Sequence, residues 1–337
     1  MAGMPVPLAP PNPTAATGPA FRVRDAWDAG YTVYGTAPSR MHAPTRAVRA
    51  MLEPVGVAQR AAAFALALPE DAAFSHTTAA RLWGLPLPRS LHHGPEDADA
   101  LHVMRATNRS AIERSGCVHH RGLERRAVAR LDGLPVTSIA DTWCDLIEAH
   151  HARLTHADAV MLGDAAVELI RPTRWETEAH PAADPSSSAW WTDPVTAGCR
   201  ALRNVVIGRR SFRGRRRARE SLPFIRPRVW SPMESYSRVV MVQGGIPEPE
   251  LNATIHHADG GGFIAIGDMV WRKKAFRRKV VGEYNGATHE AGPSRDADHT
   301  KRLALEDEGW TLMEIYAGDV FAASRRFTLV TRLRGLL

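Results

Sequence analysis

SPMESYSRVVMVQGG, at residues 231–245, begins the stretch of this chain that decides its fold. Ser231, Pro232 and Glu234 form an S-P-x-E helix start, in which Ser is the N-cap, Pro lies in the first turn and Glu closes a capping box. Gly244 and Gly245 then end the helix, because glycine adopts the conformation that helix C-termini require. The pattern predicts a helix over 231–245.

Strand-like segments follow this helix in close succession. They alternate with turn residues, as in ADGGG at 258–262, and a further helix interrupts them before the last strand. The expected strands are NATIHH (252–257), FIAIGDMVW (263–271), KVVGEY (279–284) and WTLMEIY (310–316), with helices over about 295–308 and from the last strand to the end. The order helix, strand, strand, strand, helix, strand, helix predicts a small α/β domain.

The segments before residue 231 divide the rest of the chain. Residues 199–225 look helical and contain RRSFRGRRRAR at 209–219, whereas 171–198 are rich in Pro, Ser and Ala and carry no continuing period. We therefore expect a linker over 171–198, an N-terminal α/β domain over 21–170, a C-terminal domain over 199–337 and a disordered tail over 1–20. Two domains suit a chain of 337 residues.

The charge is unevenly distributed between these parts. The whole chain carries a net +7, but residues 201–337 hold 24 Lys and Arg against 15 Asp and Glu, and residues 1–200 hold 19 against 21. A basic half indicates a polyanionic partner, with nucleic acid as the first candidate. High-GC coding would explain the preference for Arg over Lys, but not the concentration of charge in one half.

Composition also excludes several classes of protein. A hydrophobic content of 44% is enough for packed cores, and no run approaches the ~18 apolar residues of a membrane-spanning helix. The three cysteines are widely spaced and give neither a disulfide framework nor a zinc knuckle. The N-terminus lacks the features of a secretory signal, so we expect a cytoplasmic protein without a membrane segment.

Two carboxylates in the C-terminal strands are candidate metal ligands. Asp268 sits at the end of one expected strand and Glu283 near the end of the next, on the face that it shares with Asn285. If the strands pair, the carboxylates converge and can bind Mg²⁺ or Mn²⁺ beside a phosphodiester. By spacing alone, the same pattern favours two solvated carboxylates at strand ends, because such carboxylates are common and usually solvated.

Basic residues near these carboxylates are candidate phosphate contacts. Those in the loop between the two strands are Lys273, Lys274, Arg277 and Arg278, and those in the preceding arginine run are Arg215, Arg216 and Arg217. The simpler interpretation of the arginine run is a solvated helix face.

Taken in order, the C-terminal motifs resemble a known family. SPMESYSR (231–238), GGIPEPELN (244–252), IGDMVW (266–271), VVGEYNGATH (280–289) and RDADHTKRLALEDEGW (295–310) are similar to the Vsr-like (very-short-patch-repair endonuclease-like) domain of the PD-(D/E)XK nuclease superfamily. FSHTTAARLWGLPLP (74–88) and GLPVTS (133–138) resemble the abortive-infection antitoxin family of actinobacterial proteins, whose members often begin with a winged helix.

The resemblance implies a restriction-endonuclease-like core with a mixed sheet flanked by helices, behind an α/β domain with a possible divergent winged-helix part. It implies metal-dependent hydrolysis of DNA, with Asp268 and Glu283 as the metal-binding acids. Glu234 would be the acid of the first core helix, and Asn285 and His289 would be further catalytic residues. Arg295 and Arg302 would flank the site and bind DNA.

This sequence departs from the family pattern at two positions. Asn285 stands where the superfamily has Lys, and Gly267 precedes Asp268 where the family has Pro. Lys279 shares the face of Glu283 but lies about 13 Å away along a strand. A replacement cation could come from Arg295, Lys301 or Arg302 on the following helix.

Several residues have a structural interpretation beside the functional one. Glu234 is equally a capping-box residue. Adjacent histidines such as His119-His120 point apart on a strand and do not chelate as a pair, so we interpret them as structural or surface residues. Ser75-His76 lacks the elbow of a nucleophilic serine.

The sequence therefore leaves two main functions open, and a third as a further alternative. The first is a metal-dependent DNA endonuclease of a DNA-repair or defence type. The second is a catalytically weak or inactive DNA-binding, antitoxin-like regulator that keeps the nuclease fold. The third is a protein-interaction partner in a toxin–antitoxin or defence operon.

Overall fold

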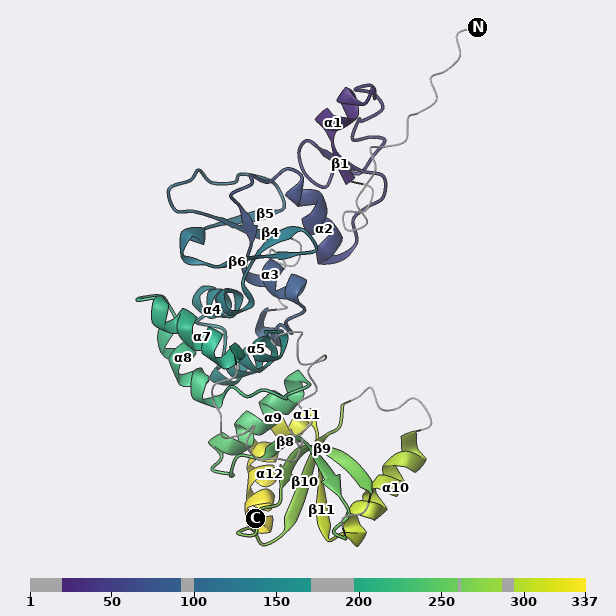
Figure 1. Cartoon of the computed structure of the whole chain (residues 1–337), viewed down its shortest axis with the longest axis vertical. Helices are drawn as coiled ribbons and strands as arrows, with labels where there is room; N and C mark the ends of the chain where they lie inside the picture. Colours follow the sequence, from purple (N-terminus) through teal and green to yellow (C-terminus); the bar gives the residue numbers. More distant parts are fainter. Residues whose placement is uncertain (1–19, 92–99, 171–196, 260–261, 287–293) are drawn as a thin grey trace. The chain divides into compact units, whose positions relative to one another are not determined.

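The computed structural model describes residues 20–91, 100–170, 197–259, 262–286 and 294–337 (Figure 1). The chain forms two compact units, the first made of residues up to Arg153 with Arg209–Arg213, and the second of Leu154–Gly208 with Gly214–Leu337. Both units mix helices with sheets, so the predicted α/β fold class is confirmed. The expected tail over 1–20 and the linker over 171–198 lie almost wholly outside the described residues.

The first unit contains two small sheets and the helices that cover them. Its helices are α1 (Val23–Asp28), α2 (Gly56–Ala65), α3 (His76–Trp83) and α4 (Ile139–Ala149), and its strands are β1 (Ala20–Arg22), β2 (Val48–Ala50), β3 (Ala73–Phe74), β4 (Leu101–Arg105), β5 (Cys117–Arg121), β6 (Val128–Leu131) and β7 (Leu134–Thr137). β6 and β7 form a hairpin around Asp132-Gly133, where both turn residues have the positive φ of a tight hairpin turn.

The larger sheet of this unit has the strand order β5-β4-β3-β7-β6. β4 pairs parallel to β5 and β3 parallel to β7, whereas the β3–β4 and β6–β7 pairs are antiparallel. Phe74, Val103 and Val136 lie together on the central strands and form the middle of the hydrophobic core. Ser138 caps α4 by accepting a hydrogen bond from the Asp141 amide.

The second unit consists of a helical part followed by a four-stranded sheet. Its helices are α5 (His156–Leu169), α7 (Ala197–Gly208), α8 (Arg215–Ser221), α9 (Pro232–Gln243), α10 (Ser294–Asp307), α11 (Ala317–Phe321) and α12 (Ala323–Leu336), and its strands are β8 (Glu250–His256), β9 (Phe263–Trp271), β10 (Lys279–Tyr284) and β11 (Trp310–Ile315). From α9 onward the element order agrees with the prediction, except that the last helix is divided into α11 and α12.

The sheet of the second unit is mixed and covered on both faces (Figure 1). Its order is β11-β10-β9-β8, with β10 and β11 parallel and the other pairs antiparallel. Met269 and Val280 face one hydrophobic cluster, which also contains Met241 of α9 and Leu333 of α12. On the other face, Val270 and Val281 pack with Leu305 of α10.

The boundary between the units differs from the expected one. The first domain was expected to extend to residue 170, but α5 belongs to the second unit. The reason is a set of buried polar contacts with α9: Asp164 Oδ2 accepts hydrogen bonds from Ser235 Oγ at 2.8 Å and Arg238 Nη2 at 3.0 Å. Such a partnership between distant segments leaves no local signal in the sequence.

The arginine run at 209–219 was expected to lie within one helical segment, but the structure divides that segment into two helices. α7 ends at Gly208 and α8 begins at Arg215, so Arg209, Arg210 and Arg213 lie in the break between two helices. Gly214 caps α8 with a left-handed φ of 82°. A residue in that conformation cannot continue an α-helix, and the chain therefore changes direction within the run.

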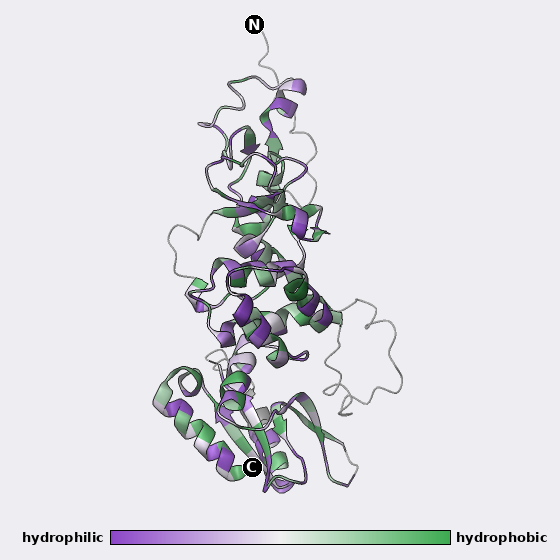
Figure 2. Ribbon diagram, turned by 90° about the vertical axis from the view of Figure 1, so that its left-hand side faces the viewer, coloured by the Kyte–Doolittle hydropathy of each residue, from purple (hydrophilic) through white to green (hydrophobic). Residues whose placement is uncertain are grey.

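Helices in the described parts of the chain present both hydrophobic and hydrophilic residues (Figure 2). None of them, in those parts, is long and apolar enough to cross a membrane.

Candidate functional site

Asp268 and Glu283 are brought together on neighbouring strands. The antiparallel register of β9 and β10 pairs Val281 with Val270 and Gly282 with Met269, so the next position places Glu283 opposite Asp268. The backbone amide of Tyr284 donates a hydrogen bond to Asp268 Oδ2 at 2.9 Å. Because opposed residues share a face of a sheet, both carboxylates lie on the side covered by α10.

A row of carboxylates runs across this face, and cations of α10 lie against it. Glu314 of β11 is the register partner of Glu283, which extends the row to a third strand. Lys301 forms an ion pair with Glu283, and Arg302 Nη2 approaches Glu314 Oε1 at 2.6 Å. Leu305 is one turn after Lys301 and is fully buried against the sheet, which directs this face of α10 toward the carboxylates.

Lys301 is thus the cation that the structure places at Glu283. The side chains of Lys301 and Glu283 are 31% and 19% exposed, so the pair is partly shielded and still reachable by solvent. The sequence left Arg295, Lys301 and Arg302 as alternatives for this position. Arg302 is directed to Glu314 instead, and the side chain of Arg295 lies outside the described part of the structure.

Two further expected site residues lie after β10. Asn285 is half-buried, and its backbone amide donates to the Ile315 carbonyl at 2.8 Å, which extends the pairing with β11 by one residue. It lies two residues after Glu283, on the same expected face of the strand. His289 lies outside the described residues.

Glu234 has a structural role at the start of α9, although its carboxylate accepts from the amide before the N-cap and not from the Ser231 amide that a capping box predicts. Ser231 Oγ accepts a hydrogen bond from the Glu234 amide at 3.2 Å, and Glu234 Oε2 accepts from the Trp230 amide at 3.1 Å. Asn252 of β8 donates to the same carboxylate oxygen at 2.7 Å. The carboxylate is therefore buried and fixes the start of α9 to the sheet, and its expected catalytic role stays a prediction.

The phosphate contacts expected in the β9–β10 loop and in the arginine run lie at two places away from the carboxylates. Lys273, Lys274, Arg277 and Arg278 are exposed at the tip of the β9–β10 hairpin, where they line a hollow together with Trp310 and Glu306. Asp268 and Glu283 lie three and four residues from the tip-side ends of their strands, about 10–13 Å at the rise of a strand. The loop is thus beside the candidate metal site along the hairpin and does not surround it.

The arginines of α8 have unequal surroundings. Arg216 is exposed and pairs with Glu220 one turn later, with Nε and Oε1 2.7 Å apart. Arg215 and Arg217 are half-buried. The helix therefore presents its charge to solvent mainly through Arg216 and Arg219.

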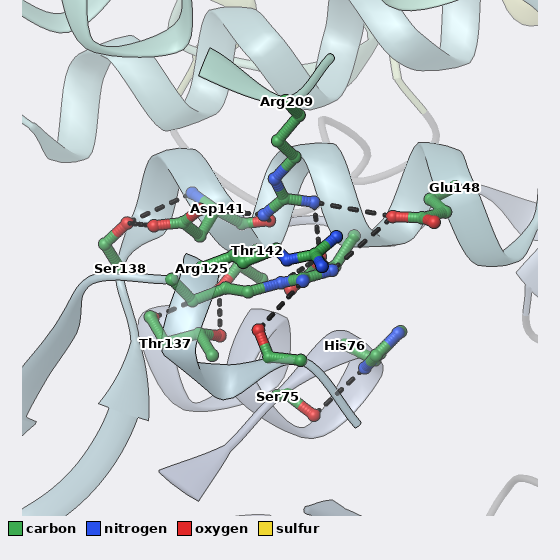
Figure 3. A network of polar contacts seen from close by, with 12 residues as sticks. Ser75, His76, Arg125, Thr137, Ser138, Asp141, Thr142, Glu148 and Arg209 are labelled. Atoms are coloured by element: carbon green, nitrogen blue, oxygen red, sulfur yellow. Dashed lines mark hydrogen bonds and ion pairs between the residues drawn. The ribbon is translucent and has the colours of Figure 1, made fainter. Parts of the chain in front are cut away.

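The first unit contains a buried ionic network that the sequence did not indicate (Figure 3). Arg209 Nη2 lies 2.7 Å from Asp141 Oδ1, and Arg209 Nη1 lies 2.6 Å from Asp145 Oδ1. Arg126 Nη2 approaches the same Asp145 oxygen at 2.8 Å. Burial alone would lower the pKa of Arg209, but the carboxylates of Asp145 and Asp141 raise it, so the guanidinium stays charged.

This network removes one arginine from the basic run. Arg209 is 8% exposed and is held by two acidic residues of α4, so it is not available to a phosphate. Buried charges are retained when they are paired, which explains why these carboxylates lie on the inner side of α4. The sequence did not suggest the pairing, because about 64–68 residues separate its two sides.

A group of three histidines was also missed. His76, His102 and His120 come from α3, β4 and β5, and their ring nitrogens lie within 4.8 Å of one another. Sequence analysis considered His119-His120 only as an adjacent pair. The alternation of strand residues would have separated His120 from His119, but it could not have supplied the two other partners.

Ser75 gives no support to a nucleophilic serine. Its hydroxyl lies 2.9 Å from His76 Nδ1, but the residue is fully buried and has no access to a substrate.

Comparison with known proteins gives relatives without an assigned activity. No family model matches the chain, and no solved structure matches it. Two uncharacterized proteins from two strains of Mycobacterium tuberculosis are 37% identical over 120 residues, which is 35% of this chain. The matched region spans 42% of the length of each of these relatives.

Proposed function

We propose that the second unit is a metal-dependent DNA endonuclease that hydrolyses phosphodiester bonds. The observation that carries the proposal is the position of Asp268 and Glu283 on one face of paired strands, with Lys301 against Glu283. This arrangement supplies two hard oxygen donors and one cation at the same place.

The residues at this place suit Mg²⁺ or Mn²⁺. Carboxylate oxygens are the preferred ligands of both ions, and the amide oxygen of Asn285 is an uncharged third donor on the same face. When bound, such an ion would activate water and neutralise charge on the phosphate. Asp268 and Glu283 would hold it on the strands, and Lys301 would stabilise the negative charge that develops on the phosphate.

The ion pair also fits a role for Lys301 as the replacement cation. Asn285 leaves the usual lysine position without a charge, whereas the ammonium group of Lys301 comes to Glu283 from α10. Removing Lys301 should therefore act in two directions. Metal binding should strengthen because a competing cation is lost, while turnover should fall by ~10²–10³-fold because an electrostatic contact to the reacting phosphate is lost.

The basic hairpin tip would contact the DNA at a distance from the cleaved bond. A separation of 10–13 Å along the strands corresponds to about three to four base pairs at the rise of B-DNA. A duplex whose axis follows the hairpin would place neighbouring phosphates at Lys273, Lys274, Arg277 and Arg278.

Nicking of supercoiled plasmid tests the proposal. The full chain is incubated with Mg²⁺ or Mn²⁺, together with variants Asp268→Asn, Glu283→Gln and Lys301→Met. Asp319→Asn is the matched control, because Asp319, like Glu283, is paired with a cation, here Arg325, but lies on α11. Absence of nicking by the wild type, or equal nicking by Asp268→Asn, would refute the proposal.

The second candidate is a DNA-binding regulator without turnover. It is favoured by the Lys301–Glu283 pair itself, which satisfies the carboxylate without a metal, and by the uncharged Asn285. It predicts salt-sensitive DNA binding that survives both Asp268→Asn and EDTA. Binding that requires the metal would exclude it.

A further inference from the structure

The three histidines of the first unit meet on the side of the sheet that faces away from Val103 and the hydrophobic core around it. The parallel register of β4 and β5 pairs His102 with Val118 and Met104 with His120. His102 and Met104 are two residues apart on β4, so His102 lies on the same face as His120. His76 is the first residue of α3 and follows β3 by two residues. His76 and His102 are 6% and 5% exposed, and His120 is half-buried.

The rings are arranged closely. His102 Nδ1 and His120 Nε2 are 2.9 Å apart, which places one proton between two ring nitrogens. The rings of His76 and His120 are stacked with centroids 3.7 Å apart, and those of His102 and His120 with centroids 5.1 Å apart. The ring nitrogens that could act as ligands all lie within 4.8 Å of one another.

Burial keeps the imidazoles of His76 and His120 in their neutral form. Burial, with a smaller contribution from the neighbouring His102, lowers the pKa of His120 to about 3. Burial likewise lowers the pKa of His76 well below its ordinary value, with His120 and His102 contributing in the same direction. Neutral imidazole is the form that binds metals, so this group needs no deprotonation at neutral pH.

His76 is held in an unusual backbone conformation. Its φ is 51°, in the left-handed region, which costs a non-glycine residue about 1–2 kcal/mol. Its Nδ1 lies 2.9 Å from the hydroxyl of Ser75, and a hydrogen bond at Nδ1 leaves Nε2 as the atom available to a ligand. Histidines that bind metals are commonly oriented in this way by a bond at the second nitrogen.

We propose that His76, His102 and His120 form a binding site for one divalent transition-metal ion, with Zn²⁺ as the ion that the ligands suit best. Three imidazoles match Zn²⁺, Cu²⁺ or Ni²⁺ and do not suit Mg²⁺. The site is therefore separate in its chemistry from the carboxylates of the second unit, and it does not rest on the proposed endonuclease activity.

Metal binding requires the rings to rotate out of their stacked arrangement, because their interplanar angles of 22° and 14° leave the nitrogen lone pairs nearly parallel. A tetrahedral ion with bonds of ~2.0–2.1 Å separates its ligand nitrogens by about 3.3 Å. The pair His102 and His120 would open from 2.9 Å, and His76 would rotate toward them from within 4.8 Å. The proton between His102 and His120 would move to the second nitrogen of its own ring, and the ion would take its place and tie the start of α3 to β4 and β5.

The charges around the site are compatible with a cation. Arg126 lies close enough to influence both His76 and His120 electrostatically. Its guanidinium is paired with Asp145, with Nη2 and Oδ1 2.8 Å apart, and lies 3.5 Å from Glu148 Oε2. Arg209 shares both carboxylates, so these two acids and Asp141 together compensate two arginines.

Metal analysis of the untagged full chain tests this site. The protein is stripped with EDTA, supplied with ZnSO₄, freed of excess metal and assayed for bound zinc by mass spectrometry, beside His102→Asn and His120→Asn. His119→Asn is the matched control, since His119 is adjacent on β5 but points to the opposite face. We expect one zinc per chain for the wild type and for His119→Asn, and a loss of affinity of more than ~100-fold for the other two variants.

Two measurements on the wild type keep the test independent of variant folding. Zinc should raise the melting temperature by about 5 °C or more at 100-fold excess over its dissociation constant. Cobalt should give the visible absorption of a tetrahedral site with nitrogen ligands. Failure of the wild type to retain zinc, or retention that is unchanged in both His102→Asn and His120→Asn, would overturn the proposal.

Discussion

Replacement of Arg238 by methionine removes the countercharge of a carboxylate that solvent does not reach. Arg238 is fully buried, and Asp164 is 1% exposed; Arg238 Nη2 and Asp164 Oδ2 lie 3.0 Å apart. Asp164 also accepts hydrogen bonds from Ser235 Oγ and the Arg226 amide, each at 2.8 Å. These bonds hold the carboxylate in place after the arginine is lost, so it cannot turn out to water.

The loss of stability in Arg238→Met follows from the burial of the Asp164 carboxylate. Removal of one partner of a buried ion pair lowers the free energy of unfolding by about 3–5 kcal/mol. Burial raises the pKa of Asp164, and Arg238 lowers it, so the pKa rises further in Arg238→Met. The folded state then binds a proton that the unfolded state releases above pH ~3.9, and stability falls as the pH rises through the raised pKa. Acidification should therefore recover up to about 1.4 kcal/mol per pH unit.

Urea unfolding of the full chain at several pH values measures this effect. Hydrogen exchange of α5 and α9 assigns the loss to the second unit, because the pair joins these two helices. A control is Arg216→Met, whose exposed pair with Glu220 should leave unfolding unchanged. An unchanged midpoint in Arg238→Met, or the same pH slope as the wild type, would refute the reasoning.

Three other outcomes are expected. Burial raises the pKa of Cys144 to about 12, so at pH 8 only about one thiol in 10⁴ is a thiolate, and alkylation of this cysteine should require unfolding. In Gly267→Ala, the added Cβ would lie 2.8 Å from side-chain atoms of Val270 and Val281, so a loss of about 1–3 kcal/mol is expected by denaturation. For the hairpin tip, the double variant Lys273→Ala, Lys274→Ala should reduce the slope of log K for DNA binding against log salt concentration by about 1.8. An unchanged slope would exclude these two lysines as phosphate contacts.

Much of the second unit could be read from local sequence. The helix start at Ser231 and Glu234 is set by hydrogen bonds within four residues, and the structure contains those bonds. The strands after it alternate between residues that face the two hydrophobic clusters, which fixes the order of elements. Even the expected pairing of Asp268 with Glu283 depends on one short hairpin, so local pattern was sufficient for it.

The partners of these elements could not be read in the same way. The sequence left three cations for Glu283, and the packing of Leu305 decides that Lys301 approaches it. α5 looked like the end of the first domain because its own pattern is that of any helix. Its membership in the second unit depends on Asp164 and Arg238, which are 74 residues apart.

The sequence by itself thus determined which segments are helices and strands, because capping, turn and alternation signals act over a few residues. Tertiary structure alone decided the charge pairs, the domain boundary and the meeting of His76, His102 and His120. Each of these depends on side chains from separate elements arriving at one buried place. Their partners are selected by the cost of leaving a buried charge or polar group unpaired, and that cost exists only once the chain has folded.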